Sequence, residues 1–331
     1  ITSHKNFKAS HSLKEIKTRI DSVNSTRKIT SAMKMVASSK LHHAQAAIQS
    51  MLPYENLLEH ILKSFLLTVP EAWNELESQR PVKRVAFVVY TSNSSLCGGF
   101  NNNVIKMLSS AVDDYKAHGI DDIIVYPIGR KVEEYVVKQG LTKAGSYLEI
   151  VDKPNSAGCA AIAKELRDKF IAHEIDKVEI IYHHFKSAGS QILTRKTYLP
   201  IDLSTESIGN ENDRDLSSNT ITAKAQEYLK KCKLDEEGVK AEVKPLNDNF
   251  IVEPDMKTVL GTLIPKQLNL QIYTALLDSN ASEHAARMVA MQTATDNANE
   301  LLRDLNLQFN KSRQQAITNE LLDIVGGSSN R

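Results

Sequence analysis

Two long stretches of this chain contain neither glycine nor proline. They are residues 1–52 and residues 266–325. Gly and Pro are the residues that most disfavour a helix interior, and an average helix has only about 11–12 residues. The sequence therefore predicts a long N-terminal helix. It also predicts, between Pro265 and Gly326, one C-terminal helix about 60 residues long that would span roughly 90 Å.

The motifs that mark common catalytic and nucleotide-binding sites are also absent. The chain contains no G-x-x-x-x-G-K-[ST], no G-x-G-x-x-G after a strand, no G-x-S-x-G, no H-E-x-x-H and no C-x-x-C. The two histidine pairs, at 42–43 and 183–184, lack metal-ligand spacing because adjacent side chains point in different directions. We therefore expect no catalytic residue, no nucleotide site, no cofactor and no metal, and the sequence disfavours an enzyme.

Cysteine and long apolar runs are scarce. Cys97, Cys159 and Cys232 lie far apart, which fits a reducing compartment and no disulfide framework. No run of 18 apolar residues occurs, so no membrane span is expected. The leading residues 1–11 are polar, without a pattern, and are expected to be a flexible N-terminus.

Charge is balanced overall but unevenly distributed. The net charge is +1, which argues against nucleic acid as a ligand of the whole chain, yet residues 1–50 carry nine Lys and Arg against two acidic residues. This local charge of +7 suggests an acidic partner. A basic helix face in contact with solvent is the alternative.

The C-terminal stretch has the 4-3 spacing of a coiled coil. Nine of twelve positions in this spacing are apolar, and many are small: Leu277, Ala281, His284, Met288, Met291, Thr295, Ala298, Leu302, Leu305, Phe309, Ser312 and Ala316. The N-terminal stretch has an apolar set of its own that continues only after a phase shift: Leu13, Ile16, Ile20 and Val23, then Ile29, Met33 and Val36. Arg27, Lys28, Thr30 and Lys34 interrupt it. The simplest use of two such stretches is antiparallel pairing.

Helix ends are marked near the N-terminus. Ser12 is a predicted N-cap, with Glu15 as its capping-box partner. Pro53 is expected to end or kink this helix, and a second apolar stretch continues to Pro70.

The middle of the chain alternates between strand and helix patterns. Strands are predicted at 85–90, 123–128 and 178–182, helices at 104–115, 130–138 and 160–173, and an antiparallel hairpin strand at 192–201. The predicted fold class is α/β, a long antiparallel coiled coil of N- and C-terminal helices with an inserted Rossmann-like α/β domain. The expected parts are 1–11, a coiled-coil helix at 12–70, the α/β domain at 81–202, a polar insertion at 203–250 with a short helix at 222–232, and a coiled-coil helix at 255–326.

One glycine pair needs a choice between two interpretations. Gly98 and Gly99 follow a strand and precede a helix, as in a phosphate-binding turn. Close backbone packing is the interpretation we favour, which makes them residues of a structural turn.

Four segments together resemble one family closely. They are SLKEIKTRIDSVNSTRKITSAMKMVASSK at 12–40, LCGGFN at 96–101, ASEHAARMVAMQTATDNA at 281–298 and KSRQQAITNELLDIVGG at 311–327. They are similar to the gamma subunits of F-type ATP synthases, and the resemblance spans both helical stretches and the turn between them. It implies a non-catalytic rotor that turns inside a ring of three alpha and three beta subunits. The further implied partners are the epsilon subunit and a membrane ring of c subunits.

The resemblance also implies roles for individual residues. Lys28, Met33 and Lys34 would face acidic lever segments of the beta subunits, and Glu253 would lie at the foot, near the c-ring. Near the C-terminus, the residues that match the family's contact with the ring are Arg313, Gln314, Thr318 and Glu320. The expected location is peripheral, on the cytoplasmic side of a bacterial inner membrane, or alternatively on the matrix side of the mitochondrial inner membrane.

Two other classes of protein are compatible with parts of the pattern. A non-rotary coiled-coil scaffold that binds nucleic acid would use the basic N-terminal helix and show salt-sensitive binding. A small α/β enzyme with helical oligomerisation arms would need a cofactor and a cleft with perturbed titratable groups. Neither class needs the run SRQQAITNELLDIVGG at 312–327.

Overall fold

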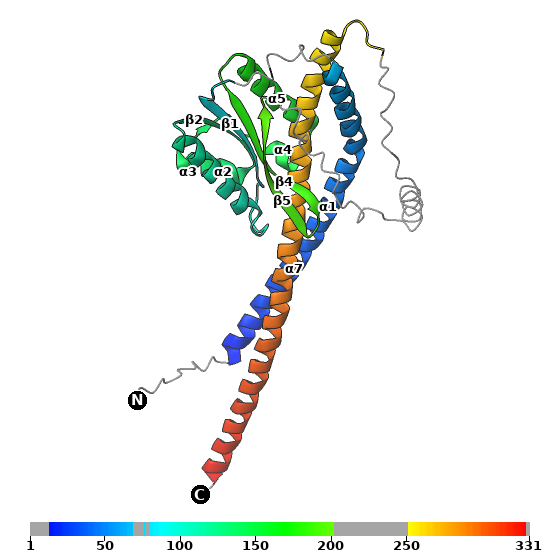
Figure 1. The fold of residues 1–331 in the computed structure, drawn as a ribbon. Helices are drawn as coiled ribbons and strands as arrows, with labels where there is room; N and C mark the ends of the chain where they lie inside the picture. The colour runs from blue at the N-terminus through cyan, green and yellow to red at the C-terminus, as the bar shows by residue number, and fades with distance from the viewer. Residues whose placement is uncertain (1–12, 69–75, 77–79, 202–250, 329–331) are drawn as a thin grey trace, which may run out of the picture. The chain divides into compact units, whose positions relative to one another are not determined.

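The computed structural model describes residues 13–68, 76, 80–201 and 251–328, which belong to two compact units (Figure 1). We call Ile1–Val36 with Met288–Arg331 the helical unit, and Ala37–Arg287 the α/β unit. Helix α1 (Leu13–Thr68) and helix α7 (Met256–Ser328) each contribute residues to both units. The predictions for residues 1–12, the 203–247 insertion, its short helix and Cys232 lie outside the described residues.

Both long helices contain a proline, so the predicted start of the C-terminal helix after Pro265 was wrong, and of the two outcomes expected at Pro53 an end of the helix does not occur. Pro53 lies inside α1, which continues to Thr68, and Pro265 lies inside α7, which begins at Met256. Proline cannot donate to the carbonyl four residues earlier, and its ring crowds that carbonyl. In α7 that residue is Gly261, which is exposed and has no atom within 4 Å of its Cβ position. Asp255 caps α7 by accepting from the Thr258 amide at 2.9 Å.

The α/β unit is built on a mixed five-stranded sheet with the strand order β3-β2-β1-β4-β5. Its strands are β1 (Arg84–Tyr90), β2 (Asp122–Ile128), β3 (Thr142–Lys143), β4 (Lys177–Ser187) and β5 (Ser190–Leu199). The first four are parallel, and β5 pairs antiparallel with β4. The predicted strands are therefore present, including the antiparallel one.

Helices cover both faces of this sheet (Figure 1). Helices α2 (Phe100–Ala117) and α3 (Arg130–Gln139) pack on the face that presents Phe87 and Val125. The other face presents Tyr90 and Tyr126, which bond respectively to α7 and to α5 (Ser156–Ile171). The short helix α4 (Glu149–Asp152) precedes α5. Sequence patterns missed α4 and β3, since two to four residues are too few to show a period.

In the helical unit, α7 buries the side that the heptad pattern predicts. From Met288 to Ser312 every predicted heptad position is buried or half-buried, whereas Ala316 is exposed. On α1 the predicted phase shift was wrong, because Ile29 is 60% exposed and Val36 is 57% exposed. The 4-3 spacing continues without a shift through polar residues instead: Ile16, Ile20, Val23, Arg27, Thr30 and Lys34 are all buried or half-buried. An apolar pattern alone could not find these positions, because polar side chains are buried when they are hydrogen-bonded.

Candidate partner-binding surfaces

Hydrogen bonds join α1 and α7 within the helical unit. The hydroxyl oxygens of Thr30 and Thr295 are 2.8 Å apart, and the Arg27 guanidinium donates to Asn299 Oδ1 at 3.4 Å. Arg27 also donates to Asn24 on its own helix, while its Nε is buried with no hydrogen-bond partner among the residues that the structure describes. These residues form a polar layer inside an otherwise apolar contact.

The three residues expected to face a beta subunit lie close to this polar layer in sequence. Lys28 is exposed, whereas Met33 and Lys34 are half-buried. Within the described parts of the chain, neither lysine forms an ion pair. Both charges are therefore available to an acidic partner.

The four polar residues expected near the C-terminus are all exposed on α7. Helical spacing puts Gln314 and Thr318 on one side and Arg313 and Glu320 on another. Large apolar side chains between and after them are 48–67% exposed: Ile317, Leu321, Leu322, Ile324 and Val325. A cluster of exposed apolar residues with polar neighbours is typical of a surface that binds another protein.

The turn after β1 is closed by its own polar groups. Ser92 donates its amide to Asn101 Oδ1 at 3.0 Å, and Asn101 Nδ2 lies 3.1 Å from Cys97 Sγ. Gly98 has φ +60°, a conformation that favours glycine. The carbonyls of Cys97 and Gly99 accept the amides of Phe100 and Asn103 at the start of α2. With those amides used internally, the geometry favours packing over phosphate binding.

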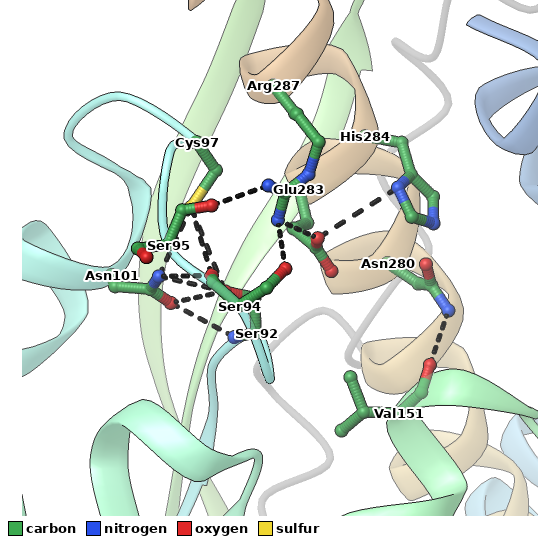
Figure 2. Close-up of polar contacts among 10 residues, drawn as sticks. All are labelled: Ser92, Ser94, Ser95, Cys97, Asn101, Val151, Asn280, Glu283, His284 and Arg287. Carbon is green, nitrogen blue, oxygen red and sulfur yellow. Dashed lines mark hydrogen bonds and ion pairs between the residues drawn. The ribbon is translucent and has the colours of Figure 1, made fainter. Parts of the chain in front are cut away.

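Arg287 of α7 connects to this turn (Figure 2). Its guanidinium donates to the Ser95 carbonyl at 2.5 Å, to Ser94 Oγ at 2.8 Å and to Glu283 Oε1 at 2.7 Å. Burial raises the pKa of Glu283, and the Arg287 charge opposes that increase. Burial, together with Lys40 and Arg287, lowers the pKa of His284 to about 4.

Further polar contacts attach the first part of α7 to strand β4 and to helix α4. His184 Nδ1 lies 2.8 Å from Asp278 Oδ2, and both side chains are fully buried. Ser282 donates to the His183 carbonyl, and Asn280 donates to the Val151 carbonyl, as Figure 2 shows for Asn280. Burial lowers the pKa of His183 to about 4. Sequence reasoning missed these contacts, although the polar residues between 278 and 284 were a signal, since they lie within an otherwise apolar pattern.

Glu179 is the centre of a charged cluster on the opposite face of the sheet. Its carboxylate accepts from Arg195 and Tyr115 and pairs with Lys177 at 2.9 Å. Burial favours the protonated form, but the bonds from Arg195, Lys177 and Tyr115 outweigh it and lower the pKa of Glu179. Lys177 and Arg195 also lie over the Tyr115 ring. The cluster therefore fastens β5 and α2 to β4.

Other expected features are simpler. Glu253 is exposed just before α7. The described residues contain no group of three or more His, Cys, Asp and Glu that could hold a metal ion. Over the same parts of the chain, no helix combines the length and apolarity that crossing a membrane requires.

The structure thus defines a class of protein: an α/β domain between two long terminal helices, with its candidate contact residues on the helix surfaces. A family model described as ATP synthase matches residues 12–330. The ATP synthase gamma chain of Phocaeicola vulgatus is 52% identical over 317 residues, covering 96% of this chain and 99% of the relative. That of Bacteroides fragilis (strain ATCC 25285) is 53% identical with the same coverage. This chain therefore belongs to the family of ATP synthase gamma chains.

A solved structure agrees at the level of the fold. The rotor of the Euglena gracilis mitochondrial ATP synthase contains a chain that is 18% identical, with a TM-score of 0.57. The match covers 92% of this chain and 98% of that one.

Proposed function

We propose that this chain is the central rotor subunit of an F-type ATP synthase. It turns as an asymmetric shaft and couples ion flow through a membrane c-ring to ATP synthesis and hydrolysis in a ring of three alpha and three beta subunits. The observation that carries the proposal is the exposed apolar end of α7, from Ile317 to Val325. The names of the gamma-chain relatives and the rotor in the Euglena assembly support it.

The physics of this role follows from symmetry. A single chain inside a ring with threefold symmetry cannot make the same contacts with all three catalytic subunits. Each beta subunit then meets a different face of the chain, which shifts it toward a different conformation and nucleotide affinity. Rotation moves these three states around the ring.

Within the helical unit, α1 and α7 are proposed to form an antiparallel left-handed coiled coil. The supporting bonds join Arg27 to Asn299 and Thr30 to Thr295, so residue numbers rise on one helix as they fall on the other. The pair Thr30→Cys with Thr295→Cys tests this arrangement. A disulfide within one chain is expected, and a disulfide only between chains would make these helices oligomerisation arms.

The contact surfaces are assigned as part of this proposal. Lys28, Met33 and Lys34 face acidic segments of beta, and Glu253 lies near the c-ring and the epsilon subunit. The exposed residues Arg313, Gln314, Thr318 and Glu320 contact the alpha-beta ring near the end of α7. The Gly98–Gly99 turn is structural. The complex is held at the cytoplasmic side of a bacterial inner membrane.

Catalysis belongs to the beta subunits in this proposal, and the chain needs no cofactor. The absence of a phosphate-binding loop motif in the sequence supports this. The pure chain is expected not to hydrolyse ATP, and its addition to an alpha-beta ring is expected to raise multi-site turnover. Hydrolysis by the pure chain, or a ring whose turnover ignores its addition, would refute the proposal.

A further inference from the structure

The turn at residues 92–99 is connected to α7 through one side chain. Among the described residues, every hydrogen bond between this turn and α7 comes from Arg287 (Figure 2). Its two terminal nitrogens bond to different acceptors: Nη1 donates to the Ser95 carbonyl and Nη2 donates to Ser94 Oγ. The planar guanidinium can hold two such acceptors at once, which a lysine ammonium does less well.

Arg287 is itself held in place. Glu283, one helical turn earlier, accepts from Nη2 at 2.7 Å. The side chain of Arg287 is only 11% exposed, and that of Glu283 only 9%. Because both groups have little access to water, removal of either one would leave the other buried without its charged partner. Glu283 thus orients Arg287, and Arg287 orients the turn.

The turn has a conformation that needs such support. Leu96 has a positive φ of 69°, which is uncommon for a residue with a Cβ, and its apolar side chain is 61% exposed. Backbone strain persists only where surrounding contacts determine the conformation. The bonds of Ser92 and Cys97 with Asn101 join the turn to the start of α2 and do not attach it to α7.

We infer that Arg287 is a positioning residue that fixes the 92–99 turn to α7, so that the turn moves with the helix when the helix carries torque. This inference deepens the proposed function and rests on it for the torque. Arg287 is the last residue of α7 in the α/β unit. The attachment therefore acts at the position where α7 passes from this unit into the helical unit.

Hydrogen exchange in the assembled complex tests the attachment. Arg287→Ala is expected to increase amide exchange in peptides covering 94–99 by roughly tenfold. Exchange in β2 and α3 should stay as in the wild type. Arg287→Lys keeps the charge beside Glu283 and should give an intermediate increase. Arg303→Ala, an exposed arginine on the same helix, is the matched control and should change nothing in the turn.

Ion pumping per ATP hydrolysed tests the role in torque. Arg287→Ala should lower this ratio at unchanged complex yield, and Arg287→Lys should restore part of it. If Arg287→Ala blocks assembly, Ser94→Ala removes one acceptor from the turn side and should raise exchange by a smaller factor. Unchanged exchange in the turn would overturn the attachment. Raised exchange with an unchanged pumping ratio would overturn the role in torque. A wild-type chain that confers no coupled pumping would instead refute the proposed function, without affecting the exchange result.

Discussion

The two parts of α7 are anchored by different kinds of contact. Up to Arg287 the helix buries apolar side chains such as Ile272 and Leu276 in the α/β unit, and it adds to them buried polar groups such as Asp278, Ser282 and Glu283. From Met288 onward it buries an apolar stripe as far as Ser312, and beyond that the described side chains up to Val325 are exposed. Buried hydrogen bonds require one geometry, whereas apolar contacts tolerate small shifts. The polar contacts therefore specify the position of the first part, whereas the described side chains from Arg313 to Val325 are exposed.

The polar layer of Arg27, Thr30 and Thr295 is an exception within the apolar contact between α1 and the second part of α7. We call the part of α7 up to Arg287 the first region and the part from Met288 onward the second region. The polar layer introduces hydrogen bonds into an apolar contact, at some cost in stability. A polar residue at a heptad core position is the best-attested way to fix the register of a helix pair. Buried hydrogen bonds thus fix the geometry in both regions. The first region has several of them, and the second has a single polar layer.

The largest expected effect comes from removing a buried anchor of the first region. Asp278→Ala deletes the carboxylate whose Oδ2 lies 2.8 Å from His184 Nδ1 inside the fold. Loss of the partner of a buried polar group costs about 1–3 kcal/mol, and more where the group is charged. Urea unfolding of the full chain should show this loss. Asp304→Ala, an exposed aspartate in the second region of the same helix, should stay within about 0.5 kcal/mol. Equal losses for both variants would erase the difference between the two regions.

A second test uses pH within the α/β unit. Glu179→Gln removes a carboxylate whose folded-state pKa is lowered. The ionised carboxylate therefore contributes stability to the folded state. This contribution is fully present when the pH is above the unfolded-state pKa of about 4.3, and it is lost as the pH falls through the lowered folded-state pKa. The variant should lose about 2–3 kcal/mol at pH 7, and the gap to wild type should narrow below about pH 4.

The control for this pH test is Glu134→Gln. Glu134 pairs with Lys131 at the surface, with its side chain 56% exposed. Its replacement should cost under about 1 kcal/mol. A gap between wild type and Glu179→Gln that is constant from pH 3 to pH 7 would contradict the charged role of Glu179.

Most of the fold could be predicted from the sequence, because it depends on periodicity. The apolar runs at 85–90 and 123–128 gave the parallel strands, and the 4-3 spacing gave the buried side of α7 up to Ser312. Pro265 gave a wrong helix start, because the sequence alone does not show whether a proline ends a helix or lies inside it. That is a property of the folded surroundings.

The candidate sites were predicted less completely. Exposed residues such as Lys28 and Thr318 followed from the family resemblance and from helical spacing. Pairings between distant residues did not, because nothing in the sequence connects His184 with Asp278, or Ser94 with Arg287. Burial of Thr30 was also missed, because its hydroxyl is satisfied by Thr295 on another helix.

Substitutions at the exposed end of α7 should weaken the contact with partner subunits and leave the stability of the chain unchanged. Gln314→Ala combined with Thr318→Ala should leave unfolding within about 0.5 kcal/mol, since both side chains are exposed. Turnover of the reconstituted ring should fall roughly fivefold, as expected for about 1 kcal/mol of lost contact. The matched control is Gln308→Ala combined with Thr293→Ala, two exposed residues on the same helix. Equal turnover for both double variants would remove the end of α7 from the contact surface.

The smallest expected effect concerns the charge on α1. Lys28 is exposed and, within the described chain, has no acidic partner of its own. Lys28→Glu should place a negative charge against the acidic beta segment proposed to face it. Exposed pairs contribute about 0.2–1 kcal/mol, so ATP-driven pumping should fall by roughly two- to fourfold at low salt. Lys17→Glu is the matched control, since Lys17 is exposed three helical turns earlier on the same side.

Salt decides whether this effect is electrostatic. Added salt screens charges by shortening the Debye length, from about 30 Å at 0.01 M to about 8 Å at physiological ionic strength. The deficit of Lys28→Glu should therefore shrink as salt is added, whereas a packing defect would persist. A deficit that does not depend on salt, or one shared equally by Lys17→Glu, would contradict an acidic partner at this position. A pumping deficit that is confined to Lys28→Glu and reduced by salt would support an acidic partner at Lys28. The charge contact would then lie one to two helical turns from Met33, on the exposed surface of α1.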